Sequence, residues 1–223
     1  MSTSAASALC HPLLDACGVE HGFGQRGSTA PVGTVRPQQV HGTVVALVSA
    51  EGELAPKEAD AVVCAQPAQS VAVITADCVP ILACSGDGRR VAAIHAGWRG
   101  LAAGVIESGI SALIGLGESS TPLVAVIGPS IGSCCYEVDE PVLSALGERF
   151  PARLAGVTRP SSAGHAFVDL AALALIDLQR CGVQADRCAV IPDVCTRCNT
   201  ERFHSYRRDG ARAGRLIHHI STR

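Results

Sequence analysis

The sequence predicts an α+β fold in which helices pack outside mixed β-sheets. Short runs rich in valine, isoleucine and alanine, each bounded by glycine, proline, aspartate or serine, have the character of β-strands. Longer stretches with apolar residues at helical spacing follow some of these runs, but several runs adjoin without a helix between them. Because successive parallel strands need a crossover connection, this pattern favours mixed sheets over a purely parallel one.

In chain order, the strand-like runs are 43–49, 60–65, 71–77, 79–84, 91–95, 123–127, 187–191 and 214–220. A strand, a glycine turn and then a helix from Trp98 to Leu116 are expected around residue 97. Two further helices are expected after Asp139 and Asp169, each of which could cap its helix, and the second should end at Gly182. The segment 151–166 is rich in serine, proline and glycine and is expected to be a surface loop.

Composition limits the domain organisation and the partners. The 223 residues, 48% of them hydrophobic, suffice for one substantial core, so a single domain over 1–223 is expected. A net charge of -2 and 3% aromatic residues argue against nucleic-acid binding. No apolar run approaches the ~20 residues of a membrane helix, and residues 1–6 lack the features of a signal peptide. We therefore expect a cytoplasmic monomer or small homo-oligomer with no membrane partner.

Cysteine is abundant, with 11 residues in all. An odd number of cysteines in a reducing compartment predicts free thiols, most of them core or loop residues. Cys195 and Cys198 have CxxC spacing, but a lone CxxC is a weak metal signal. A disulfide between the adjacent Cys134 and Cys135 would be strained. We therefore expect these four cysteines to be ordinary loop or core thiols.

Three short segments carry residues suited to catalysis. His41 precedes a glycine just before a strand-like run, Asp77-Cys78 follows an apolar run, and His95 ends another run before a glycine turn. Two histidines and one cysteine match a catalytic zinc site, which uses three protein ligands and leaves a fourth position open. The spacing is not that of a compact metal motif, so separate structural roles for the three residues stay open on this evidence.

Six segments match, in order, the motifs of a known family, and the most specific of them read TADC at 75–78, HAGWRG at 95–100 and YRRDG at 206–210. The others lie at 18–27, 39–44 and 127–138. The chain resembles the YfiH-like family, also described as the polyphenol oxidoreductase laccase-domain family. The resemblance implies a layered αββα-type sandwich with mixed β-sheets and outer helices.

The resemblance also implies a function. It assigns His41, Cys78 and His95 as ligands of Zn²⁺, with copper a less favoured metal. The activity implied is phosphorolysis of adenosine, inosine and methylthioadenosine, with adenosine deamination as a side activity. The substrates would be a purine nucleoside and phosphate. This chain departs from the family in a shortened segment between Arg26 and Gln39, and in His204, where a second aromatic residue is more usual.

Phosphorolysis requires an anion site, for which arginine is well suited because its planar guanidinium can bond two oxygens at once. The candidates for binding phosphate or substrate are Arg26, Gln39, Arg99, Arg207 and Arg208. We expect one of the adjacent pair at 207–208 to face the site and one to face solvent, since neighbours on an extended chain point opposite ways. Catalytic roles are predicted for Cys78, His95, Asp77 and Arg207, with Asp77 as a proton shuttle if the chain bends before residue 79.

Two rival functions use overlapping residues. A cysteine hydrolase would use Cys78 as nucleophile and His95 or His41 as base. The resemblance links some family members to peptidoglycan precursors, which would then be its substrates. Asp77 or Asn199 would then orient the base. A multicopper oxidase would need many imidazoles around several coppers, and the chain has only 8 histidines.

Overall fold

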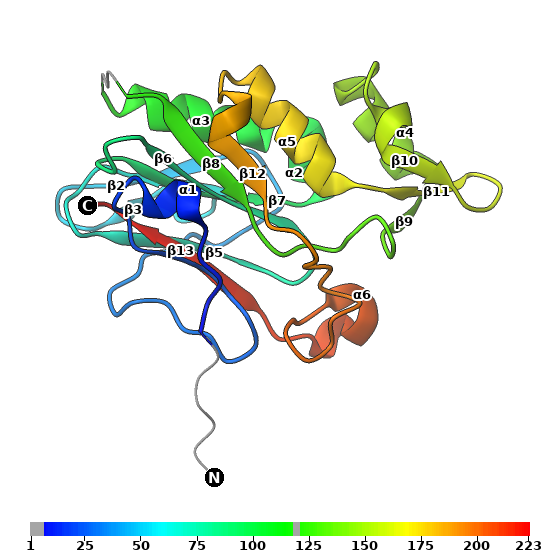
Figure 1. Cartoon of the computed structure of the whole chain (residues 1–223), viewed down its shortest axis with the longest axis horizontal. Helices are drawn as coiled ribbons and strands as arrows, with labels where there is room; N and C mark the ends of the chain where they lie inside the picture. The colour runs from blue at the N-terminus through cyan, green and yellow to red at the C-terminus, as the bar shows by residue number, and fades with distance from the viewer. Residues whose placement is uncertain (1–6, 118–120) are drawn as a thin grey trace, which may run out of the picture.

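The computed structural model describes residues 7–117 and 121–223. The first six residues, on which the expectation of no signal peptide rests in part, lie outside these ranges. A seven-stranded mixed sheet in the order β12-β8-β6-β7-β4-β2-β3 is the centre of the molecule (Figure 1). Its strands are β2 (Val45–Val48), β3 (Leu54–Ala55), β4 (Ala61–Cys64), β6 (Val79–Ser85), β7 (Val91–Ala96), β8 (Leu123–Ile127) and β12 (Cys188–Val190).

A second, antiparallel sheet packs against one face of the large sheet. It has the order β1-β13-β5, formed by β1 (His21–Phe23), β13 (Leu216–Ser221) and β5 (Ser70–Thr75). Helices α2 (Trp98–Ala103), α3 (Val105–Gly115) and α5 (Leu170–Arg180) lie on the opposite face, as Figure 1 shows. The layered α+β sandwich with mixed sheet pairing and outer helices that the sequence predicts is confirmed.

Alternation along the central strands divides the interior into two cores. On β6, Ile81 and Ala83 point to the helical layer, whereas Leu82 and Cys84 point to the second sheet. All four side chains are fully buried. A strand buried on both faces lacks polar alternation, which explains why β6 reads as an unbroken apolar run.

The predicted helix from Trp98 to Leu116 is two helices. Gly104 between them has φ 94°, a left-handed conformation that glycine adopts without strain and that ends α2 before α3 begins. The helix expected after Asp169 is confirmed as α5, and the Asp169 carboxylate accepts the N–H of Ala172 at 2.9 Å. No helix in the described ranges is long and apolar enough to cross a membrane.

The segment 151–166 is not only a loop, as the sequence suggested. It contains the 3₁₀ helix η1 (Leu154–Val157), β10 (Thr158–Pro160) and the start of β11 (His165–Val168). These two strands form a small antiparallel sheet with β9 (Glu137–Asp139). Strands this short have too little periodicity to be recognised from sequence.

Five further elements complete the description. Helix α4 (Glu140–Arg149) follows β9 with Asp139 at its N-cap position, although that side chain makes no capping hydrogen bond. The short helix α1 (Pro12–Asp15) precedes β1, whereas η2 (Ala185–Arg187), α6 (Tyr206–Asp209) and η3 (Gly210–Arg212) lie in connections between strands. Because α6 covers 206–209, the arginine pair lies on a helical turn and not on extended chain.

His218 on β13 should make stability depend on pH. Its ring is fully buried; Nε2 lies 2.8 Å from Thr75 Oγ1, and Nδ1 accepts the N–H of Gly24 at 3.3 Å. Burial, together with the nearby rings of His219 and His95, lowers the pKa of His218 to about 3. In the unfolded chain His218 takes up a proton near pH 6.5, whereas in the folded chain it stays neutral down to much lower pH. The free energy of unfolding therefore falls as pH falls below 6.5. Between pH 7 and pH 5 this loss should be about 2 kcal/mol.

The comparison of wild type with His218→Gln isolates this contribution, since other titrating groups are common to both proteins. We expect urea unfolding to show that the wild type loses about 2 kcal/mol more than the variant between pH 7 and pH 5. Equal losses in the two proteins would contradict the prediction.

Candidate active site

Three potential metal ligands converge where separate strands end. His41 lies in the connection before β2, Cys78 in the turn between β5 and β6, and His95 near the end of β7. Their ligand atoms all lie within 4.8 Å of one another, and Cys78 Sγ is 4.0 Å from His41 Nε2. The two imidazole rings meet edge to face with centroids 4.8 Å apart. One thiolate and two imidazoles in this arrangement could hold a metal ion with an open fourth position.

The buried carboxylate of Asp60 organises two of these ligands. Oδ1 lies 2.8 Å from His95 Nδ1 and accepts the N–H of His41 at 2.8 Å, while Oδ2 accepts the N–H of Gly42 at 2.6 Å. The Asp60 side chain is completely inaccessible to solvent. By bonding Nδ1 of His95, it directs Nε2 toward the other ligands, as outer-shell carboxylates do in metal sites.

The backbone is shaped to bring the ligands together. His41 has φ 62°, a left-handed conformation uncommon for a residue other than glycine, and the hydrogen bonds to Asp60 hold it there. At Gly97 a Cβ atom would lie 3.1 Å from both Cys78 Sγ and His41 Cδ2. A side chain at this point of the strand–helix turn would crowd the ligand cluster, which glycine avoids.

The same contacts alter the proton affinities of the ligands. Burial raises the pKa of Cys78, but interactions with the two imidazoles outweigh this and bring it down to about 7. Burial lowers the pKa of His95, but the bonds to Asp60 and Cys78 raise it to about 9. The protein alone therefore favours a thiolate at Cys78, the form that binds metals and acts as a nucleophile.

A cleft of about 1120 Å³ opens beside the ligand cluster. Its lining holds four arginines and three large aromatic side chains, but only one carboxylate, which belongs to Asp77. The residues are Arg36, Arg99, Arg207, Arg215, Trp98, Tyr136, Tyr206 and Asp77. A cationic, aromatic cleft suits a ligand that combines an anion with a planar ring.

The structure brings two of the predicted arginines to the cleft. The guanidinium of Arg99 lies 4.3 Å from the Trp98 ring centroid, and that of Arg207 lies 5.1 Å from the Tyr136 ring centroid. Arg207 also donates from Nη1 to the carbonyl of Glu137 at 2.8 Å. Both guanidinium groups are thus held against aromatic faces at the edge of the cleft.

The other two predicted arginines are not among the residues that line the cleft. Arg208 donates to the carbonyl oxygens of Thr196, Arg197 and Phe203 and to the carboxylate of Asp209. Arg26 donates to the carbonyl of Phe203 at 3.1 Å and lies 3.8 Å from Asp209. Both therefore tie the C-terminal segment together.

Asp77 and Gln39 line the cleft, but their polar atoms are engaged by the protein. The chain bends at Asp77, which has φ 94°. Its carboxylate accepts from Thr196 Oγ1 at 2.5 Å, Ser205 Oγ at 3.0 Å and the N–H of Arg207 at 2.6 Å. The Gln39 amide bonds both the N–H and the carbonyl of Ile74, each at 2.8 Å. These contacts fasten the flanking segments to the end of β5.

Sequence reasoning missed several residues of the site. Asp60 is a charged residue directly before an apolar run, which is a weak signal for a buried functional carboxylate. An aspartate in an ordinary turn gives the same pattern in a single sequence. Tyr136, Arg36 and Arg215 carried no signal, since only folding brings their segments to the cleft. For the cysteine hydrolase, the group that orients His95 is Asp60 and not Asp77 or Asn199.

Replacing Asp60 by asparagine should weaken metal binding. The asparagine amide offers one acceptor oxygen where the carboxylate serves three backbone N–H groups and His95. We expect metal affinity to fall about 10- to 100-fold in a chelator competition assay. Asp177→Asn is a matched control, because Asp177 is an equally buried carboxylate on α5, paired with Arg149. Unchanged affinity in Asp60→Asn would contradict the role assigned to this carboxylate.

Comparisons with known sequences agree on the family. A sequence model of the family described as multi-copper polyphenol oxidoreductase laccase matches residues 23–223. A purine nucleoside phosphorylase of Streptomyces coelicolor is 39% identical over 191 residues, covering 85% of this chain and 75% of that protein. The purine nucleoside phosphorylase YfiH of Escherichia coli is 38% identical over 177 residues, covering 77% and 67%.

Solved structures support the same relationship. A Neisseria meningitidis protein superposes with a TM-score of 0.73 at 37% identity, covering 85% of this chain and 74% of that one. YlmD from Geobacillus stearothermophilus shares the fold, with a TM-score of 0.85 at 24% identity over 100% of this chain and 98% of that one. The chain therefore belongs to the multi-copper polyphenol oxidoreductase laccase family, the family to which the name YfiH in the sequence-based resemblance also refers.

Proposed function

We propose that this protein is a zinc-dependent purine nucleoside phosphorylase acting on adenosine, inosine and methylthioadenosine, with adenosine deamination as a side activity. The observation that carries the proposal is the set His41, Cys78 and His95 at the edge of a cleft whose free charges are arginines. Relatives named purine nucleoside phosphorylase, at 38–39% identity, support the same reaction. The substrates would be a purine nucleoside and phosphate.

Phosphate is the co-substrate that the charges of the cleft favour. Arg99 and Arg207 are braced against Trp98 and Tyr136, which reduces the freedom that an arginine side chain loses when it binds an anion. Simple hydrolysis by water would require no such concentration of positive charge. The guanidinium groups would hold phosphate by charge-assisted hydrogen bonds and place an oxygen for attack on the sugar C1′.

The nucleoside would lie across the aromatic part of the cleft. Trp98, Tyr136 and Tyr206 come from three different segments and all line it. A purine ring could pack on any of these faces, since base–aromatic stacking needs no particular hydrogen-bond pattern. Thr34 and Arg36 also line the cleft. The shortened segment after Arg26 therefore contributes to the proposed pocket despite its length.

The donor set fits zinc. Two imidazoles and one thiolate, with Asp60 behind His95, match the ligands and outer shell of catalytic zinc sites. When bound, the metal would act as a Lewis acid that stabilises developing negative charge. Two imidazoles and one thiolate also occur in mononuclear copper sites, but none of the described residues that line the cleft is a methionine, the usual axial ligand of copper, so zinc is the metal we propose.

Asp77 and Gln39 would act mainly by positioning. The Asp77 carboxylate receives the N–H of Arg207 and the hydroxyl of Ser205, so it sets where α6 begins. Gln39 bonds Ile74 on β5 and so holds the segment that leads to His41. The proton-shuttling role of Asp77 stays a prediction, and deaminase activity of an Asp77→Asn variant would test it.

A cysteine hydrolase is the alternative, and one observation favours it. Asp60, His95 and Cys78 stand in the order carboxylate, imidazole, thiol that such hydrolases use. A metal bound at Cys78 would remove the free nucleophile, so the two functions exclude each other at this site. Peptidoglycan precursors would be the substrates to test in that case.

An assay of base release distinguishes phosphorolysis from hydrolysis. Protein with a measured metal content is incubated with adenosine, inosine or methylthioadenosine, with and without phosphate. We expect release of free base only with phosphate, together with the sugar 1-phosphate, and loss of both metal and turnover in Cys78→Ser. Phosphate-independent release of base would indicate hydrolysis. If zinc-loaded protein releases no base from any of the three nucleosides, the phosphorylase assignment is wrong.

Replacing Arg99 by glutamine should damage phosphate use without removing the metal. The variant loses a charge-assisted contact, and we expect kcat/KM for phosphate to fall about 30- to 1000-fold, equivalent to about 2–4 kcal/mol. Arg159→Gln is a matched control, because its guanidinium also lies over an aromatic ring, 4.4 Å from that of Phe167, but outside the cleft. Equal effects of the two substitutions would contradict a role for Arg99 in binding phosphate.

A further inference from the structure

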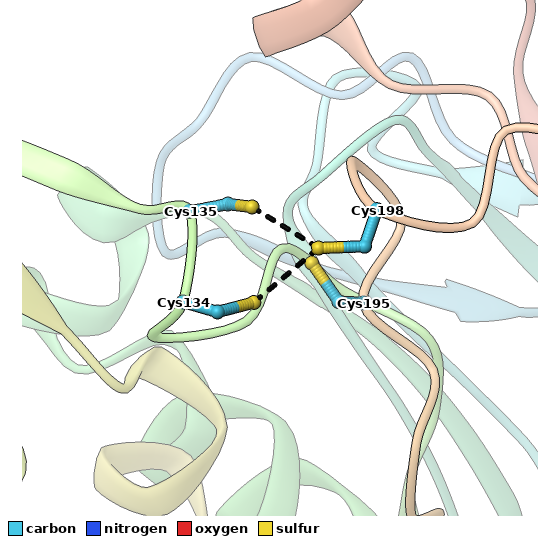
Figure 2. A group of neighbouring side chains, drawn as sticks. All are labelled: Cys134, Cys135, Cys195 and Cys198. Atoms are coloured by element: carbon cyan, nitrogen blue, oxygen red, sulfur yellow. Dashed lines mark hydrogen bonds between the residues drawn. The ribbon is translucent and has the colours of Figure 1, made fainter.

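A cluster of four thiols lies apart from the residues that line the cleft. Cys134 and Cys135 come from the connection between β8 and β9, and Cys195 and Cys198 from the connection between β12 and α6 (Figure 2). Their sulfur atoms all lie within 4.8 Å of one another. The sequence analysis treated the CxxC as lacking a second pair of cysteines, and the folded chain places Cys134 and Cys135 beside it. The lone CxxC thus has a second pair 60 residues earlier in the chain.

The distances are those of ligands around a common centre. Cys198 Sγ lies 3.5 Å from Cys134 Sγ and 3.3 Å from Cys135 Sγ. A disulfide would need about 2.05 Å between sulfurs. Four thiolates at about 2.3 Å from a tetrahedral zinc ion lie about 3.8 Å apart, close to the spacing found here. Adjacent cysteines can both face one centre because residues 133–135 form a turn, in which the N–H of Cys135 bonds the carbonyl of Gly132.

Two hydrogen-bond donors face sulfur atoms of this cluster. The N–H of Gly132 donates to Cys195 Sγ at 3.2 Å, and the guanidinium of Arg197 donates to Cys135 Sγ at 3.5 Å. A Cβ atom on Gly132 would lie 3.2 Å from Cys195 Cβ and 3.3 Å from Cys134 Sγ, so a side chain there would crowd the cysteines. A divalent ion with four thiolates carries two negative charges, which the arginine would partly offset.

We propose that Cys134, Cys135, Cys195 and Cys198 bind one structural Zn²⁺ in a closed, tetrahedral four-thiolate site. Binding releases the four thiol protons to solvent and changes no oxidation state. All four positions around the ion are filled by protein, in contrast to the three-ligand set at His41, Cys78 and His95. The second site would therefore hold structure and perform no catalysis.

The cluster would fix the two loops that complete the cleft. Tyr136 directly follows Cys135, and Thr196 lies within the CxxC segment and donates to Asp77 at 2.5 Å. Thr196 also bonds the carbonyl of Ser130 through its N–H at 3.0 Å, so the loops already touch beside the cysteines. Through Asp77 and the N–H of Arg207, the same loop reaches α6. A metal ion bound by both loops would hold Tyr136 and Arg207 in fixed positions relative to each other.

Metal analysis of the full chain tests the proposal. We expect purified, reduced protein to bind two zinc ions per chain, one at each site. Cys134→Ser with Cys198→Ser should remove one ion and leave the other, and His41→Ala should do the opposite. Cys10→Ser is the matched control, since Cys10 is an exposed cysteine outside both clusters and should keep both ions.

Cobalt substitution identifies the ligands without any assay of activity. Thiolate-to-cobalt charge-transfer absorption grows with the number of thiolates, so the four-thiolate site should dominate the spectrum. The double variant should lose most of this absorption, whereas His41→Ala should keep it. We also expect the double variant to melt about 5 °C or more below the Cys10→Ser control, because it loses a bridge between distant segments.

Other results would overturn the proposal. One zinc ion per chain, retained in the double variant, would show that the cysteines bind no metal. Detection of iron together with labile sulfide would show that the four cysteines hold an iron–sulfur cluster and not zinc. Fewer reactive thiols than cysteines in denatured, unreduced protein would indicate a disulfide. If the double variant fails to fold, single Cys134→Ser and Cys198→Ser variants and cobalt titration of the wild type give the same decision. None of these outcomes depends on whether the protein cleaves nucleosides.

Discussion

The arrangement of the candidate active site depends on one buried carboxylate. Asp60 accepts three backbone N–H groups from residues 40–42 and contacts Nδ1 of His95. Without it, three backbone N–H groups of a partly exposed segment and the buried Nδ1 of His95 would lose their partner, and the loss at His95 should cost about 1–3 kcal/mol. Asp60 directly precedes β4, whose side chains fill both cores. Burial of β4 therefore fixes the position of the carboxylate that makes these hydrogen bonds.

The sheet and the loops contribute different things to the site. Cys78 and His95 stand at the ends of strands that are fixed by packing on both faces, so their positions follow from the register of β6 against β7. The arginines and aromatic residues come from the first turns of α2 and α6 and from the segments around Arg36, Tyr136 and Arg215. Asp77 is the link between the two parts, since it follows β5 and bonds the segment that carries α6. A candidate metal site fixed by strands, with its substrate contacts on the segments between them, could retain its chemistry while its substrates change.

What could be predicted from the sequence follows this division. The segments of β6, β7 and α5 were found because burial leaves a sequence signal, which is an unbroken apolar run on strands covered on both faces and apolar residues at helical spacing on α5. The break at Gly104 and the strands β9 and β10 were missed, since one glycine or three residues do not change that signal. His41, Cys78 and His95 were singled out as one candidate ligand set only through family motifs, and the structure brings them together. Asp60 and the four-cysteine cluster needed the folded chain, because their partners lie up to 64 residues away in sequence.

The chemistry of the two cysteine groups differs for a physical reason. At Cys78 burial alone would raise the thiol pKa, and two imidazoles reverse this and leave a thiolate beside an open cleft. Around Cys198 the nearest partners are other thiols, whose mutual repulsion as anions disfavours losing several protons at once. A bound cation would remove the repulsion between the deprotonated sulfurs, and with four thiolate ligands it would have no position left for substrate. On the proposals made above, the first group would react and the second would hold two loops around it.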